Sequence, residues 1–448
     1  MNNAQTHELR RDLGLWTAVA IVVGTVIGSG IFLVPKTMIQ RVGSVEMVFV
    51  VWVFGGLLSL AGALTYAELA AAMAEAGGEY VYLREAYGPV FGFLYGWTQL
   101  LVAKSGSIAT LATGFFLYLA NFYPALEGTL FQLGPLNVKT GQVAAIGVIL
   151  GLAALNYFGV RFGGGVQVAT TVIKVGCIIA IFIVGFGAKG DFANFGGSIP
   201  SAGGFAGFFA ALVAALWAYD GWNNVAMVAS EIKNPQRNLP LALTAGTAAV
   251  VLLYVLTNLA YFYVLTPAEV AGSDRVAASM MRQVLGEWGA GAVSVAAMIS
   301  IFAAINGSIL TGSRVPFAMA RDGLFFSSIA QVHPDYRTPA NSILALSAWS
   351  ALLVLSGSYE DLFNYVIFGS WILYGLATAS VIVLRKKRPD MPRPYRTWGY
   401  PVVPVVFVLV AAALLLSTLI DNPVRSLAGL GLILAGLPFY SYWKRKRN

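Results

Sequence analysis

The chain alternates long apolar stretches with short polar ones along its whole length. About 20 apolar residues in a helix cross the roughly 30 Å hydrocarbon core of a bilayer, and runs of this length recur throughout. We predict an all-α integral membrane protein in which residues 1–448 form a single transmembrane domain of twelve spans. The predicted spans are 14–35, 44–72, 89–121, 140–158, 164–187, 203–230, 239–264, 288–320, 340–356, 361–384, 400–420 and 426–443.

Two of these apolar stretches are interrupted near their middle by residues that break helices. The first interruption is Gly28-Ser29-Gly30, and the second is Tyr219–Asn223. Lipid provides no partners for the freed amides and carbonyls, so an unwound turn at this depth must be buried in protein or line a wet cavity. Two such breaks at matching places in two halves of the chain predict the binding site of a transporter.

The positions of the two breaks also predict an internal repeat. Each half opens with an interrupted span and continues with four unbroken ones, although no repeat is visible as residue identity. We therefore predict two five-helix units, 13–187 and 203–385, followed by two appended spans within 400–443. Because each unit has an odd number of spans, the second is inserted upside down.

Composition and charge agree with a membrane location. Only 11% of the residues are charged, against roughly 25% in soluble domains. The net charge of +8 does not indicate a nucleic-acid partner, because the basic residues crowd into short loops such as 385–388 and 444–447. Nineteen of the 28 Lys and Arg residues fall in segments expected inside and seven outside, while Lys104 and Lys174 lie within spans. This bias predicts a multi-pass protein of the plasma (inner) membrane with both termini in the cytoplasm.

The residues of enzyme and metal sites do not occur in a recognisable pattern. His7 and His333 stand in polar segments, and the lone Cys177 lies within a span, which excludes an internal disulfide. The sequence contains no HExxH motif and no phosphate-binding loop. We therefore expect no catalytic residue, no metal and no cofactor.

Two polar segments have their own helix signals. Thr266-Pro267-Ala268-Glu269 reads as a capping box with Pro at the first helical position, and it predicts a short surface helix. The stretch 74–87 is amphipathic and is expected to lie along the inner face of the membrane.

The first break suits a carboxylate. A helix that resumes near Ile31 aims its first free amides, and the positive end of its dipole, into the cavity. The alternative is close helix packing, because Gly24 and Gly28 form a small-xxx-small pattern. The presence of the second break favours the ligand interpretation.

The second break suits an ammonium group, because carbonyls freed at the end of the first half-helix carry partial negative charge. Together the two breaks predict a site that holds both ends of a zwitterion. The aromatic residues Trp217, Tyr219 and Trp222 either close over the ligand or pack in the bundle.

Three ionisable residues lie deep within predicted spans, where they are costly and therefore candidates for function. Asp220 could pair with a lysine, recognise a cationic substrate, exchange a proton, or cap the second half-helix. Lys174 could join the first break to span five at a place where another transporter binds sodium, carry a proton, or form a structural ion pair. Lys104 lies similarly deep in span three.

Several motifs carry a family resemblance. Val23–Phe32 resembles the first-helix motif of the amino acid–polyamine–organocation superfamily. Trp217–Asn223 followed by Ser230–Ala242 resembles the L-type amino acid transporters of that superfamily, as do Tyr254–Phe262, Ile305–Ser308 with Ser313-Arg314, and Arg393-Pro394-Tyr395. The motifs extend over nearly the whole chain, and the chain is similar to the bacterial members of the family.

The resemblance implies a LeuT-type fold and exchange or facilitated transport of L-amino acids. It implies that amides of Ser29 and Gly30, with Thr25, hold the carboxylate, and that carbonyls at Val26, Trp217 and Asp220 hold the amine. Trp217 matches an outer gate. Lys174 matches a lysine in a sodium-site region, so no sodium dependence is expected, and Lys104 stands where many members have arginine. Animal members form a disulfide to a heavy chain through an outer-loop cysteine that this chain lacks, so we expect a monomer without such a partner.

The sequence thus predicts a sodium-independent exchanger of neutral L-amino acids that works by alternating access. The alternatives are a proton-coupled symporter, a carrier of cationic amino acids, and an amino acid sensor that does not transport. The predicted substrate-contacting residues are Thr25, Val26, Gly28, Ser29, Gly30, Ile31, Trp217, Ala218, Asp220, Gly221 and Asn223. The predicted coupling or gating residues are Lys174, Tyr219, Trp222 and Lys104.

Overall fold

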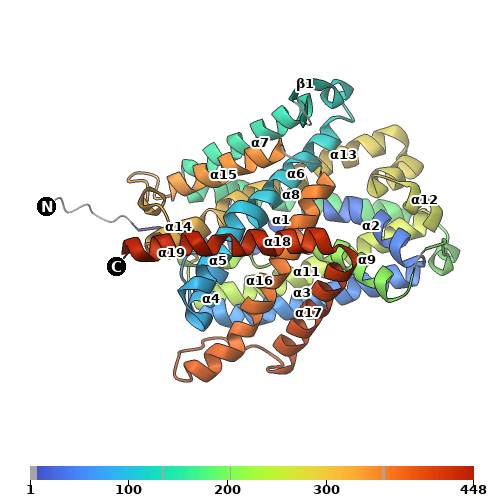
Figure 1. The fold of residues 1–448 in the computed structure, drawn as a ribbon. Helices are drawn as coiled ribbons and strands as arrows, with labels where there is room; N and C mark the ends of the chain where they lie inside the picture. The colour runs from blue at the N-terminus through green and yellow to red at the C-terminus, as the bar shows by residue number, and fades with distance from the viewer. Residues whose placement is uncertain (1–7, 134–135, 202, 356–358, 448) are drawn as a thin grey trace.

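A computed structural model describes residues 8–133, 136–201, 203–355 and 359–447 as a bundle of long helices (Figure 1). His7 lies outside the described residues. The first half contains α1 (Leu15–Val26), α2 (Gly30–Val42), α3 (Val45–Ala72), α4 (Glu79–Tyr87), α5 (Pro89–Thr98), the π-helical turn η1 (Gln99–Ala103), α6 (Lys104–Leu119), α7 (Thr140–Tyr157) and α8 (Val160–Gly187). The second half contains α9 (Gly204–Ala218), α10 (Asn224–Met227), α11 (Pro235–Val264), α12 (Pro267–Gly272), α13 (Val276–Gly312), α14 (Arg314–Arg321), α15 (Ala340–Val354) and α16 (Tyr359–Lys387). The last helices are α17 (Val402–Asp421), α18 (Pro423–Leu434) and α19 (Gly436–Arg447).

Each of the twelve predicted spans contains helix. Within the described part of the chain, eight helices are long and apolar enough to cross a membrane, and the pair α1 and α2, bent by 40°, makes a ninth. Helices α9 and α15 are apolar but shorter. The structure is therefore the predicted helical membrane protein, and the count of twelve crossings stays a prediction.

Corresponding spans of the two predicted repeats pack against each other. Helix α2 packs on α9, α3 on α11, α6 on α13, and α7 on α15. These pairs join the first, second, third and fourth spans of one unit to the same spans of the other. A pseudo-two-fold axis between inverted units would bring equivalent helices together in this way. The boundaries 13–187 and 203–385 remain predictions.

The segment 74–87 is more buried than the prediction of an amphipathic helix along the inner membrane face implies. Six of the nine residues of α4 are buried, and the helix packs against α5 and α16. The cause is a sharp turn at Gly77 and Gly78, both at positive φ, which directs the chain back into the bundle. The Gly77 amide donates to Met227 O at 2.9 Å, so this turn packs directly on α10.

Other elements depart from continuous helix. The third span contains η1, a π-helical turn of the kind that often marks functional sites. The short strands β1 (Thr129–Leu133) and β2 (Leu136–Lys139) form an antiparallel hairpin between α6 and α7 that the sequence analysis missed. The predicted cap is confirmed, because Thr266 and Glu269 form a reciprocal capping box at the start of α12.

The two ends of the described chain lie at the same end of the bundle (Figure 1). Leu13 pairs with Ile232 beside α10, and the side chain of Arg447 lies against Gly323 after α14. An even number of membrane crossings would place the two ends of the chain on the same side of the membrane.

Candidate substrate site

The two predicted breaks are real, and they meet. Residues 27–29 separate α1 from α2, and residues 219–223 separate α9 from α10. The hydroxyl of Thr25 donates to the carbonyl oxygen of Gly221 at 2.9 Å, which joins one break to the other. Gly221 has φ +108°, a conformation that a side chain would strain. The second half-helix, α10, spans only four residues and is shorter than we predicted.

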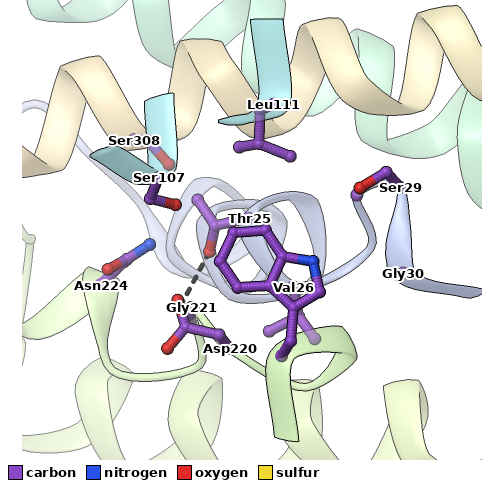
Figure 2. Close-up of a pocket in the computed structure, with 12 residues that line it drawn as sticks. Thr25, Val26, Ser29, Gly30, Ser107, Leu111, Asp220, Gly221, Asn224 and Ser308 are labelled. Atoms are coloured by element: carbon purple, nitrogen blue, oxygen red, sulfur yellow. Dashed lines mark hydrogen bonds between the residues drawn. The ribbon is translucent and has the colours of Figure 1, made fainter. Parts of the chain in front are cut away.

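A cavity lies between the breaks and the helices α6 and α13 (Figure 2). In Figure 2, Ser107, Ser308 and Leu111 face Asp220 and Gly221 across it. The cavity is lined by Thr25, Val26, Gly28, Ser29, Gly30, Ser107, Leu111, Trp217, Asp220, Gly221, Asn224 and Ser308. Backbone of both breaks therefore faces the same space, as a site for both ends of a zwitterion requires.

Three predicted substrate residues do not line the cavity. Ile31 is buried within α2. Ala218 packs against Gly30, and its carbonyl accepts a hydrogen bond from Tyr254. Asn223 turns away from the cavity and donates to Glu79.

Four lining residues were missed by the sequence analysis. Ser107 and Leu111 come from α6, Ser308 from α13, and Asn224 from the start of α10. Ser308 belongs to a motif that carries the family resemblance, so that motif was the one available signal. Ser107 is a small residue and Leu111 an apolar residue of a buried helix, and Asn224 is a polar residue directly after the second break. Only packing directs these three into the cavity.

The glycines in and near the first break serve close packing, the cavity, or both. A Cβ on Gly24 would meet Gln167 Nε2 at 2.1 Å, and one on Gly30 would meet Ala218 Cα at 2.6 Å. Both glycines allow close contact between segments, as in the packing interpretation, and Gly30 also lines the cavity. A Cβ on Gly28 would meet Leu111 Cδ2 at 3.1 Å, inside the cavity lining. Gly28 and the amide end of α2 therefore fit the ligand interpretation.

Tyr254 of α11 bonds a carbonyl on each side of the break region. Its hydroxyl lies 3.1 Å from Val26 O and 3.0 Å from Ala218 O, both at helix ends. These are the C-terminal ends of α1 and α9, where carbonyls have no partner within the helix. Tyr254 thus links the two ends that we expect to attract an amine.

Lys174 is fully buried and bonds backbone instead of a carboxylate. Its ammonium donates to Gly24 O at 2.7 Å, Ile27 O at 2.5 Å and Ser300 O at 3.0 Å. It therefore joins α8 to the broken first span and to α13. A structural ion pair, one of the three interpretations from the sequence, is not found among the described residues.

Asp220 and Lys104 have separate partners. The hydroxyl of Tyr374 donates to Asp220 Oδ1 at 2.8 Å, whereas Lys104 Nζ donates to Asn224 Oδ1 at 2.6 Å. The N-cap residue of α10 is Asn223 and not Asp220, and its side chain makes no capping hydrogen bond. The pairing of Asp220 with a lysine is likewise not found among the described ion pairs.

Two of the three aromatic residues pack in the bundle. Tyr219 donates to Trp52 O at 3.1 Å and lies edge-on to the Trp52 ring. Trp222 lies edge-on to Tyr66, with ring centroids 4.8 Å apart. Only Trp217 lines the cavity. No group of three or more His, Cys, Asp or Glu side chains within the described ranges has the arrangement of a metal site.

Comparison with known proteins decides the family. The model of the amino acid permease family matches residues 13–434. The chain belongs to the amino acid permease family. Among its relatives in this family, the b(0,+)-type amino acid transporter 1 of Mus musculus is 34% identical over 443 residues, covering 97% of this chain and 88% of the relative. The Serine/threonine exchanger SteT of Bacillus subtilis (strain 168) is 34% identical over 452 residues, covering 100% of this chain and 99% of the relative.

A third permease, the Cystine/glutamate transporter of Homo sapiens, is 30% identical over 436 residues, covering 97% of this chain and 85% of the relative. These relatives are named for different substrates but all as transporters or exchangers. The resemblance inferred from the motifs is therefore confirmed over almost the full chain.

Proposed function

We propose that this permease exchanges neutral L-amino acids across the plasma membrane by alternating access. The observation that carries the proposal is the meeting of both breaks at one cavity, whose lining includes residues from the start of α2 and from the ends of α1 and α9. The relatives named as amino acid transporters and as a Ser/Thr exchanger support the same activity.

The proposed substrate lies with its carboxylate at Ser29 and Gly30 and its amine near the carbonyls of Val26, Trp217 and Asp220. Its side chain then faces Ser107 and Ser308. These two hydroxyls favour a small or hydroxyl-bearing side chain. Thr25 is a weaker candidate for the carboxylate than the sequence suggested, because its hydroxyl bonds Ile21 O and Gly221 O.

Movement in this proposal occurs between two packed groups. Helices α6, α7, α13 and α15, from spans three, four, eight and nine, pack on one another as a scaffold. The helices that carry the breaks pack with α3 and α11. The unwound residues 27–29 and 219–223 supply the hinges between the two groups.

Sodium independence follows from Lys174 in this proposal. Its ammonium already bonds the carbonyls of Gly24, Ile27 and Ser300, which are the kind of ligands that a sodium ion takes. A fixed positive charge at this place leaves no room for a second cation.

The proposal also includes orientation and assembly. Both termini face the cytoplasm, following the Lys and Arg bias. The protein works as a monomer without a heavy-chain disulfide, because its one cysteine, Cys177, lies in α8 and not in an outer loop.

Counterflow in proteoliposomes tests the proposal. Labelled neutral amino acid is expected to leave preloaded vesicles only when unlabelled substrate is present outside, with or without sodium. Accumulation driven by a pH gradient without internal substrate would instead support a proton-coupled symporter. Tight binding without any counterflow would support a sensor.

A second candidate substrate class is the cationic amino acids. The observation that favours it is Asp220, a carboxylate on the cavity wall whose Oδ1 atom is held by Tyr374. Competition by lysine and arginine in the same counterflow assay, compared with serine, alanine and leucine, separates the two classes.

A further inference from the structure

Behind the unwound segment 219–223, Glu79 at the start of α4 carries a fully buried carboxyl group. The side-chain amide of Asn223 donates to Glu79 Oε1. The other oxygen of the acid, Glu79 Oε2, and the amide oxygen, Asn223 Oδ1, have no hydrogen-bond partner among the described residues. One hydrogen-bonded pair of side chains thus contains two buried acceptors without a donor.

The surroundings of this pair do not compensate a negative charge. No ion pair to Glu79 occurs among the described residues, and the ammonium group of Lys104 donates to Asn224 instead. Tyr66 packs edge-on against Tyr82, with ring centroids 5.9 Å apart, and so adds aromatic surface around the acid. The titratable side chains that interact electrostatically with Glu79 come from five helices: Tyr66 of α3, Tyr82 of α4, Tyr95 of α5, Lys104 of α6 and Tyr374 of α16. A further acid, Asp220, lies in the same unwound segment as Asn223.

Helix α4 precedes the third span, and burial raises the pKa of the Glu79 carboxyl above its ordinary value. The hydrogen bond from Asn223, the neighbouring hydroxyl of Tyr95 and the charge of Lys104 act in the opposite direction and offset only part of this effect. Burying a carboxylate without an ion-pair partner costs free energy, and this cost favours the neutral form of the acid.

We propose that Glu79 is a proton-binding site whose neutral carboxyl forms a two-bond acid–amide pair with Asn223 in the arrangement described here. A proton on Oε2 converts that atom from acceptor to donor, and Asn223 Oδ1 is the acceptor that lacks a donor. One proton taken from water therefore satisfies both orphaned atoms and removes the buried charge.

The consequence for transport rests on the proposed function. Asn223 belongs to the unwound segment that hinges during alternating access, so hinging would separate the acid from the amide and admit water to Glu79. The arrangement described here then binds one proton more than the opened one, at pH values between the ordinary and the raised pKa of this carboxyl. Raising the pH through this window favours opening. The proton returns when the segment closes, so exchange becomes pH-dependent without net proton transport.

Infrared spectroscopy of the purified full-length protein tests the proton directly. The C=O stretch of the protonated Glu79 carboxyl is expected to persist above the ordinary pKa of glutamic acid, in the wild type and in Asp220→Asn. It should shift on exchange into heavy water and be absent in Glu79→Gln. A wild type without this band, or a band that survives in Glu79→Gln, would overturn the proposal. Should Glu79→Gln not fold, Glu79→Asp replaces it: the band is expected to shift, and an unchanged band would overturn the proposal.

Counterflow at several pH values tests the coupling. Glu79→Gln, which keeps a donor and an acceptor toward Asn223, is expected to exchange with its pH dependence lost. Glu85→Gln on the same helix is the matched control and should keep the wild-type profile. A Glu79→Gln profile identical to the wild type would refute the coupling. The infrared band needs no transport, so absent counterflow with the band present would reject the exchange function and leave the proton site standing.

Discussion

Thr25 and Gly221 are 196 residues apart in the chain, and the hydroxyl of Thr25 donates to the carbonyl of Gly221 at 2.9 Å. The donor lies in the last turn of α1 and the acceptor within the second unwound segment. This bond joins the two interrupted spans at the cavity wall.

Removing the hydroxyl of Tyr254 is expected to slow exchange. Tyr254→Phe deletes the donor shared by Val26 O and Ala218 O, at a cost of about 1 kcal/mol, or roughly fivefold in rate or affinity. Initial rates of counterflow measure the effect. Tyr261→Phe is the matched control, because Tyr261 is buried in the same helix and its hydroxyl has no partner among the described residues. Equal rates in the two variants would show that the bridge has no role.

Replacing Lys174 is expected to impair transport more than folding. Lys174→Met keeps the length of the side chain but leaves three buried carbonyls without their charged donor, and we expect roughly tenfold slower exchange or more. Lys189→Met in the exposed segment after α8 serves as the control. Counterflow rates and thermal midpoints of both variants are compared. Wild-type kinetics in Lys174→Met would reduce this residue to a packing role.

Two glycines of the first break are expected to respond differently to the same substitution. In Gly30→Ala the new Cβ would meet the backbone of Ala218 at 2.6 Å, so the helices must separate, and overpacking of this kind costs about 1–3 kcal/mol. In Gly28→Ala the nearest atom is the end of the Leu111 side chain at 3.1 Å, which can move.

Thermal unfolding and substrate binding separate these effects. Gly30→Ala should lower the thermal midpoint, whereas Gly28→Ala should fold normally and bind substrate more weakly. A stable Gly30→Ala with full transport would contradict the close approach of α2 and α9.

The contact between α14 and α4 is expected to hold one side of the bundle closed. Asp322 accepts hydrogen bonds of 2.8 Å from both Tyr80 and Arg84. Asp322→Asn weakens this contact by about 1 kcal/mol, because Arg84 is partly exposed, and opening should become roughly fivefold more frequent.

Thiol labelling measures this opening. Ser308→Cys in a Cys177→Ala background reports access to the cavity, and Asp322→Asn should accelerate its labelling from the side of the bundle on which α4 and α14 lie. Asp335→Asn, in the exposed loop after η5 (Ser327–Ala330), is the control. Unaltered labelling in Asp322→Asn would exclude Asp322 from the closure.

The sequence by itself determined the membrane class and the two breaks. Apolar runs that are long enough to span a bilayer, and that recur along the whole chain, are best buried in lipid. Glycine or polar residues in the middle of such a run indicate unwound backbone. For this reason the second break, Tyr219–Asn223, was located correctly, and the first, predicted at Gly28–Gly30, lies within one residue of the observed 27–29. The capping box at Thr266 could also be predicted, because its two partners lie within four residues of each other in the chain.

Only the tertiary structure decided which side chains face the cavity and what each ionisable group contacts. Ser107, Ser308 and Asn224 reach the cavity because α6, α13 and α10 converge there, and Asn223 turns instead to Glu79. The turn at Gly77 and Gly78 carries Glu79 into the bundle, although its segment looks amphipathic. These contacts join residues more than a hundred positions apart, and helical periodicity specifies which face is buried but not which neighbour it meets.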